Sequence, residues 1–362
     1  MNLMKKLKNL KTLYNQNIPK QVTFAITNHC NMVCTTCSFP GVPKSERKHV
    51  SIDNAKYAIE FMKHNGVKMV SITGGEPLMH PQFLDICKLI SDEDMMISYI
   101  STNGTLVTED IAKELAKFNV NIIGLSIDVT NELGLGVTRK VNIKKTVVKA
   151  KKLLDKYLLD SYAGIVLGKH TKDIKNVLRT VRGLGFKKVI FSYPQVEMNS
   201  SYLAAKNSNE LDCDVKFWNE LINNILKEKR WNPYVDIFNT RVNLQEFNNF
   251  YSDHEYTFQC PAGREQFYLD WDLELFRCLN SNERYGNLHE LNDLNFPYTS
   301  CSKCTQQTHR DYASFYHAYK TAKSLEEAMK RLDFRRFFRL LTLKTNRRAL
   351  NSLIEGYLGG FA

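Results

Sequence analysis

Short apolar runs alternate with longer amphipathic stretches from residue 21 to about 195. The short runs predict strands at 22–27, 67–73, 95–101, 121–127, 161–167 and 187–193. In the longer stretches apolar residues recur every three or four positions, which predicts helices near 51–65, 80–91, 106–117, 140–157 and 170–183. Strands that alternate with helices indicate a parallel sheet with crossover helices. Curled up, such a sheet forms a partial (β/α)6 barrel, with ligands at the C-terminal ends of its strands.

The chain beyond this α/β core is expected to add smaller units. The pattern predicts a helix near 214–229 and a β-hairpin over 267–278 that turns near Trp271 and Asp272. Ser324 and Glu327 have the spacing of a capping box, and the tail beyond 315 is helical and amphipathic. The predicted segments are a basic N-terminal extension, the α/β core, a helical linker, a small cysteine-rich α+β domain and a basic helical tail, at 1–20, 21–200, 201–258, 259–310 and 311–362.

Charge is concentrated at the two ends of the chain. The formal net charge is +12 over 362 residues. Residues 1–20 carry five lysines and no acidic residue, and residues 315–362 carry ten Lys and Arg against four acidic residues. No apolar run approaches the roughly 18 residues that span a bilayer, and the N-terminus lacks the pattern of a signal peptide. We therefore expect a cytoplasmic protein with a nearly neutral body and basic ends.

Seven of the nine cysteines fall into two groups, which in a reducing compartment indicates metal ligands. Cys30, Cys34 and Cys37 follow the first predicted strand. Three thiolates suit a cubane iron–sulfur cluster with one open iron, because such a cluster has four irons. Two other interpretations remain: three buried thiols, or a zinc site completed by a fourth thiol from the C-terminal part.

The second predicted strand leads into Gly74-Gly75-Glu76-Pro77. Together with Cys-x-x-x-Cys-x-x-Cys, this run resembles the radical S-adenosylmethionine (radical SAM) superfamily over roughly residues 21–200. The resemblance implies that Cys30, Cys34 and Cys37 hold a 4Fe–4S cluster whose open iron is chelated by S-adenosylmethionine. It also implies contacts with this cofactor; the residues are Gly74, Gly75 and Glu76 for its amino group, and Ser126 and Asp128 for its ribose. No catalytic acid or base is assigned.

A second group of thiols consists of Cys260, Cys278, Cys301 and Cys304. Four thiols suit either a closed zinc site or a fully ligated cubane cluster. Their spacing around the hairpin resembles the Twitch domain, a shorter relative of the SPASM domain of radical SAM maturases. This resemblance implies one auxiliary 4Fe–4S cluster. The remaining thiols, Cys87 and Cys213, are expected to be small packed residues.

These observations predict an enzyme that cleaves S-adenosylmethionine reductively and abstracts a hydrogen atom from a small metabolite, a peptide or a lipid precursor. The auxiliary cluster would transfer electrons or bind substrate, and flavodoxin or ferredoxin would supply the electron. A zinc-stabilised scaffold without radical chemistry is the alternative.

The tail carries an aromatic face and an arginine face. Phe334, Phe337, Phe338 and Leu341 share one side of a helix, and Arg331, Arg335, Arg336 and Arg339 lie largely on another. This pattern fits either a peripheral contact with the anionic inner face of a membrane or a helix packed on the barrel. No aromatic and basic strand pattern of a nucleic-acid-binding module is present.

Overall fold

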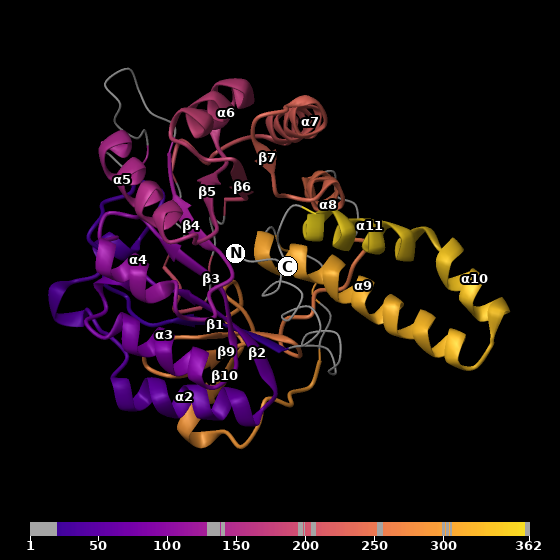
Figure 1. The fold of residues 1–362 in the computed structure, drawn as a ribbon, viewed down its shortest axis with the longest axis horizontal. Coiled ribbons are helices and arrows are strands. Elements are labelled where there is room, and N and C mark those ends of the chain that lie inside the picture. Colours follow the sequence, from indigo (N-terminus) through magenta and orange to yellow (C-terminus); the bar gives the residue numbers. More distant parts are fainter. Residues whose placement is uncertain are drawn as a thin grey trace.

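The computed structural model describes residues 20–128, 138, 142–194, 198, 200–203, 208–251, 256–298, 301, 304 and 306–358. One ten-stranded sheet organises this part of the chain, in the order β10-β9-β8-β1-β2-β3-β4-β5-β6-β7 (Figure 1). The run from β8 to β7 is parallel, and β9 and β10 continue it in antiparallel fashion. The predicted basic N-terminal extension lies outside the described residues, except for Lys20.

All six strands predicted for the α/β core are present and pair in parallel in sequence order. They are β1 (Lys20–Ala25), β2 (Val67–Thr73), β3 (Met96–Thr102), β4 (Ile123–Ser126), β5 (Ser161–Val166) and β6 (Lys188–Ser192). The five predicted helices are confirmed as α2 (Ile52–His64), α3 (Phe83–Asp92), α4 (Glu109–Leu115), α5 (Ile143–Lys156) and α6 (Ile174–Gly183). Short 3-10 helices span Phe39–Gly41, Lys44–Glu46, Pro77–Met79, Lys169–Thr171 and Leu288–Glu290. The order of these strands and helices is the one that the sequence predicts for the α/β core.

The two faces of the sheet bury different kinds of side chain, apolar on one face and polar on the other. Val22 and Phe24 of β1 belong to the main apolar core with residues from α2 and α3, whereas Gln21 and Thr23 on the opposite face are buried polar residues. Gln21 continues a row of hydrogen-bonded side chains across the strands, which runs Ser98, Ser71, Gln21, Gln266 and His309. A buried hydrogen-bonded row of this kind fixes the relative positions of the elements that supply it.

The C-terminal half adds strands to both edges of this sheet. The predicted helix near 214–229 is α7 (Val215–Trp231), followed by β7 (Asp236–Ile237) and α8 (Arg241–Tyr251). β8 (Gln266–Leu269) pairs with β1, and β9 (Glu274–Phe276) and β10 (Arg284–Asn287) follow. The predicted hairpin is confirmed, with Tyr268 opposite Phe276. Its turn forms around the buried Asp270, whose carboxylate accepts from the backbone N–H groups of Asp272 and Glu274.

Three helices end the described chain: α9 (Gln307–Lys330), α10 (Phe334–Thr342) and α11 (Lys344–Leu358). The predicted capping box at Ser324 and Glu327 is wrong, because α9 begins at Gln307, with Gln306 as its N-cap, and continues through Ser324. The residues around Ser324 are mostly good helix formers, so nothing local ends the helix there. In Figure 1 the three helices form an arm with α10 at its far end. Within the described ranges, no helix has the length and apolar character needed to cross a membrane.

Candidate functional site

The cysteine loop leaves the C-terminal end of β1. Cys30, Cys34 and Cys37 are all partly exposed. The backbone N–H of Cys37 donates to the carbonyl of Cys34 at 3.4 Å, which turns the loop between the two thiols. Ser38 N–H donates to Leu203 O at 2.8 Å, and Thr35 N–H donates to Thr138 O at 2.8 Å. The loop is therefore fixed on both sides by segments that follow β4 and β6.

The glycine run after β2 lies directly against the cysteine loop. Gly75 N–H donates to Thr27 O at 2.9 Å, and Glu76 N–H donates to His29 O at 2.8 Å. A Cβ on Gly74 would lie 2.2 Å from Thr27 O, and one on Gly75 would lie 2.4 Å from His29 O. Gly74 also has a φ of +141°, which side-chain-bearing residues rarely adopt. Only glycine lets these two backbones meet at the residue before Cys30.

Glu76 is buried, and its carboxylate binds the loop after β3. Its Oε1 accepts from Thr102 Oγ1 at 2.6 Å and from Leu78 N–H at 3.2 Å. Its Oε2 accepts from Asn103 N–H at 2.7 Å. Asn103 in turn donates from Nδ2 to Asn31 Oδ1 at 2.8 Å. Glu76 thus connects the glycine run to the β3 loop, and Asn103 connects that loop back to the cysteines.

We expect Glu76→Gln to lower the free energy of unfolding by roughly 2 kcal/mol. In either amide orientation the new NH2 group faces a backbone N–H, because each carboxylate oxygen accepts from one. Urea unfolding measures the loss. Glu93→Gln is the matched control, because Glu93 pairs only with the exposed Lys63 at the surface. Equal unfolding midpoints for the two variants would contradict the role of Glu76.

Ser126 and Asp128 lie at the end of β4, as the sequence predicts, but Asp128 is engaged elsewhere. Ser126 is half-buried at the last position of the strand. Asp128 is buried, and its Oδ2 accepts from the backbone N–H and the hydroxyl of Thr138. Because the carbonyl of Thr138 accepts from Thr35, Asp128 supports the cysteine loop from the β4 side. Contact between its carboxylate and a ribose stays a prediction.

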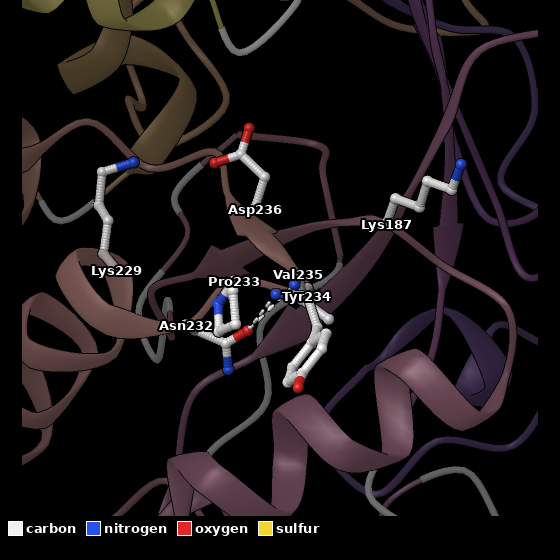
Figure 2. A pocket seen from close by; sticks show the side chains of 7 residues that line it. All are labelled: Lys187, Lys229, Asn232, Pro233, Tyr234, Val235 and Asp236. Carbon is white, nitrogen blue, oxygen red and sulfur yellow. Dashed lines mark hydrogen bonds between the residues drawn. The ribbon is translucent and has the colours of Figure 1, made fainter.

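Two cavities differ in their relation to the cysteines. One of about 600 Å³ lies beside the cysteine loop and is lined by residues that include Cys34, Cys37, Val33 and Leu203. The other, of about 420 Å³, is lined by Lys187, Lys229, Asn232, Pro233, Tyr234, Val235 and Asp236 (Figure 2). Lys187 and Asp236 stand at the N-terminal ends of β6 and β7, and the cysteines follow the C-terminal end of β1. The second cavity therefore lies at the N-terminal ends of the parallel strands, whereas the candidate site lies at their C-terminal ends.

The four C-terminal cysteines form a second group at the start of α9. Cys260, Cys278 and Cys304 are buried and Cys301 is partly exposed. Burial raises the pKa of the Cys278 thiol to about 12 and that of Cys304 to about 11, and negative charge on the neighbouring cysteines adds to both shifts. Gln306 N–H donates to Cys304 Sγ at 3.2 Å. Thiols that raise one another's pKa in this way are close neighbours, and a bound metal relieves the repulsion between their anions.

Two buried arginines adjoin this second group. Arg310 donates from Nη2 to Phe258 O at 2.7 Å, and its guanidinium lies 3.6 Å from the ring centroid of Tyr256. Arg277 donates from Nε to Ala262 O at 3.3 Å. The Nε and Nη1 atoms of Arg310 are buried without a hydrogen-bond partner among the residues that the structure describes. The positive charge of Arg310 partly offsets the effect of burial on the pKa values of Cys260 and Cys304.

A known family of domains matches the part of the chain that contains the first site. The family model described as the radical SAM superfamily matches residues 24–182. That stretch contains Cys30, Cys34 and Cys37, the glycine run and the strand ends described above. The chain carries a radical SAM domain. The match covers less than half of the chain and ends before the second cysteine group.

Curated relatives match about half of the chain. A probable GTP 3′,8-cyclase of Methanocaldococcus jannaschii is 26% identical over 168 residues, which are 46% of this chain and 56% of that protein. The antilisterial bacteriocin subtilosin biosynthesis protein AlbA of Bacillus subtilis is 31% identical over 183 residues, which are 50% of this chain and 40% of that protein. The chain thus matches about half the length of these relatives.

Solved structures share the fold over a longer stretch. A structure of anSMEcpe with bound AdoMet has a TM-score of 0.58 at 19% identity, and the match covers 75% of this chain and 78% of that one. Streptococcus suis SuiB bound to its precursor peptide SuiA has a TM-score of 0.59 at 15% identity, with 81% and 68% covered. The fold likeness therefore extends beyond the radical SAM domain.

An aromatic cluster packs the first cysteine loop against the hairpin that precedes Cys278. Phe39, Tyr268, Trp271 and Phe276 belong to its buried core, and Cys30, Cys37 and Tyr202 pack against it. Tyr202 also bonds through its hydroxyl to Thr73 Oγ1 at 3.1 Å, at the end of β2. Phe276 ends β9, two residues before Cys278. The aromatic layer thus extends from the first cysteine group to the strand that leads into the second group.

Several residues at these sites carry no signal in the sequence. Arg310 lies 50 positions from Cys260, and Asn31 lies 72 from Asn103, so no local pattern links them. Asp311 is buried, accepts from Asn243 and Gln307, and has its pKa raised to about 7 by burial. Among the described residues, no three His, Cys, Asp or Glu side chains converge closely enough for a single metal ion.

Proposed function

We propose that this protein is a radical SAM enzyme and that Cys30, Cys34 and Cys37 hold its 4Fe–4S cluster. The observation that carries the proposal is the contact between Gly74–Gly75 and the backbone of Thr27 and His29, which leaves no room for a Cβ. A scaffold needs no such contact beside three partly exposed thiols. The contact brings a glycine backbone, free of side chains, next to an incompletely ligated metal site, which suits a ligand bound to the metal.

When bound, the cluster supplies one electron that cleaves S-adenosylmethionine to methionine and a 5′-deoxyadenosyl radical, which takes a hydrogen atom from the substrate to give 5′-deoxyadenosine. The residues of this chain bind and orient the reactants. Gly74 and Gly75 present backbone to the amino group of S-adenosylmethionine, and Glu76 holds the β3 loop against it through Thr102 and Asn103. Ser126 is the candidate to contact the ribose of S-adenosylmethionine.

The second group, Cys260, Cys278, Cys301 and Cys304, fits an auxiliary cluster of the Twitch type. Its buried donors support this part of the proposal: among the described residues, the Nε and Nη1 atoms of Arg310 have no hydrogen-bond partner, and cluster sulfurs would accept from them. Zinc bound by four thiolates is the alternative. The auxiliary cluster would receive an electron from the substrate radical or bind the substrate.

Arg310→Met is expected to lower the reduction potential of the auxiliary cluster by an amount on the order of tens of millivolts, because a cation and its hydrogen bonds favour the more negative reduced state. A redox titration followed by electron paramagnetic resonance measures the shift. Arg284→Met is the control, since Arg284 is exposed on β10 and pairs with Glu274. Equal potentials in the two variants would contradict the contact between Arg310 and the cluster.

The substrate class is proposed from relatives, and the approach of the electron donor from a cavity beside the first site. The names of AlbA and of the SuiB complex refer to a bacteriocin and a precursor peptide, so a peptide is the substrate class to test before small metabolites and lipid precursors. A flavodoxin or ferredoxin in the cytoplasm would donate the electron. The cavity beside Cys34 and Cys37, with Val33 71% exposed next to it, is the approach we propose for this donor.

Metal and sulfide analysis of the anaerobically reconstituted protein tests this proposal. Two cubane clusters require about eight irons and about eight sulfides per chain. Zinc in stoichiometric amounts without sulfide would instead support the scaffold interpretation. About four irons together with one zinc would retain the radical SAM site and overturn the auxiliary cluster.

A further inference from the structure

Helix α10 presents an aromatic face that the protein does not cover. None of its nine residues is buried. Phe334 is 54% exposed and Phe338 is 61% exposed, and the two lie one helical turn apart on the same side. Leu332 before the helix and Leu343 after it are also exposed. Exposed apolar side chains therefore form a strip along α10, and α10 lies at the tip of the arm (Figure 1).

Arginines border this strip on one side. Arg335 and Arg339 follow Phe334 and Phe338 by one residue each, so the two pairs form adjacent rows along the helix. Both arginines are exposed. Residues 329–348 hold eight Lys and Arg residues against one acidic residue, Asp333. Of the acidic residues at the end of α9, Glu326 pairs with Lys323 and Lys330, and Glu327 pairs with Arg336.

We propose that α10 is a docking surface for an anionic lipid bilayer, with Phe334 and Phe338 inserted at the level of the headgroups and Arg335 and Arg339 bound to lipid phosphates. Charge selects this occupant. A second copy of the chain would bring the same excess of positive charge against itself, which opposes pairing of two α10 helices. Nucleic acid would satisfy the arginines but would leave the phenylalanine strip in water. A bilayer with acidic headgroups receives both rows at once.

The position of α10 suits this role. Its main contacts are with α9 and α11, and in Figure 1 it lies at the far end of the arm from the sheet. Binding there leaves the cysteine loop and the cavity beside it uncovered. The inference rests on α10 alone, so it stands or falls independently of the proposed radical chemistry.

Vesicle co-sedimentation of the full-length chain tests the proposal, with vesicles of phosphatidylcholine alone and of phosphatidylcholine mixed with phosphatidylglycerol. We expect binding to the mixed vesicles and little to phosphatidylcholine alone. Arg335→Gln/Arg339→Gln should weaken binding roughly thirtyfold, because each basic residue near an anionic surface contributes about a fivefold gain. Phe334→Ser/Phe338→Ser should weaken it at least as much, because each exposed phenylalanine loses its burial in the bilayer.

Trp231→Ser is the matched control, since Trp231 is 68% exposed and lies at the end of α7, outside α10. Circular dichroism and iron content should be unchanged in all variants, because no side chain of α10 is buried. Binding that survives the phenylalanine variant, or that Trp231→Ser removes equally, would overturn the proposal. The proposal would also be overturned if the wild-type chain did not bind the mixed vesicles, or if α10 mediated a dimer or bound RNA instead.

Discussion

Replacing Cys34 by alanine is expected to abolish the cleavage of S-adenosylmethionine. Three thiolates bind three of the four irons of a cubane and leave one iron open. Loss of one thiolate therefore leaves the cluster incompletely bound. Iron per chain should fall from about eight to about four, because the auxiliary group keeps its own ligands. The measurement is iron analysis together with release of 5′-deoxyadenosine under reducing, anaerobic conditions.

Cys213→Ala is the matched control. Cys213 is a partly exposed thiol outside both groups; it packs against the main apolar core and donates a long hydrogen bond of 3.9 Å to Glu210 O. The Cys213→Ala variant should retain about eight irons per chain and full cleavage of S-adenosylmethionine. If Cys34→Ala kept its iron and its activity while a variant at Cys278 lost both, the assignment of the two cysteine groups would be reversed.

Gly75→Ala is expected to reduce S-adenosylmethionine cleavage by a factor on the order of a hundred, because small displacements of a positioned reactant cost that much. The new methyl group would lie 2.4 Å from the carbonyl oxygen of His29, against rigid backbone. The glycine run and the cysteine loop must then separate, and both the cluster and its ligand shift. Activity at saturating S-adenosylmethionine, with iron content measured in parallel, separates misplacement from loss of the cluster.

Gly183→Ala provides the comparison for this variant. Gly183 ends α6, and a Cβ there has no neighbour within 4 Å. Alanine at this helical position should leave activity unchanged and raise stability slightly. Unimpaired activity in Gly75→Ala would show that the close approach of the two loops does not serve the reaction.

Most of the α/β core could be predicted from the sequence because each strand has its own apolar run. The run at 67–73 became β2 with the same bounds, and its neighbours differ by at most three residues at either end. β7 escaped prediction because two residues carry no periodic signal. Ser324 was misassigned as a helix start, since a capping spacing says nothing about whether the preceding residues are already helical.

The candidate site could be predicted in its residue types but not in its contacts. Cys30, Gly75 and Glu76 were found from spacing, yet the carboxylate of Glu76 turns toward Asn103, and that depends on how two loops meet in space. Arg310 is buried near Cys304 without any pattern in the sequence that pairs them. Likewise the spacing of Phe334 and Phe338 defines a face, but only the packing of the arm reveals that the face is uncovered.

Reductive cleavage of S-adenosylmethionine by this protein can be tested by mass spectrometry of the anaerobically reconstituted protein after reduction with dithionite and addition of S-adenosylmethionine. We expect equal amounts of 5′-deoxyadenosine and methionine, formed slowly without substrate and faster when the correct peptide or other substrate is supplied. Samples with full iron and sulfide content that release neither product, alone or with peptide, metabolite and lipid extracts, would contradict it.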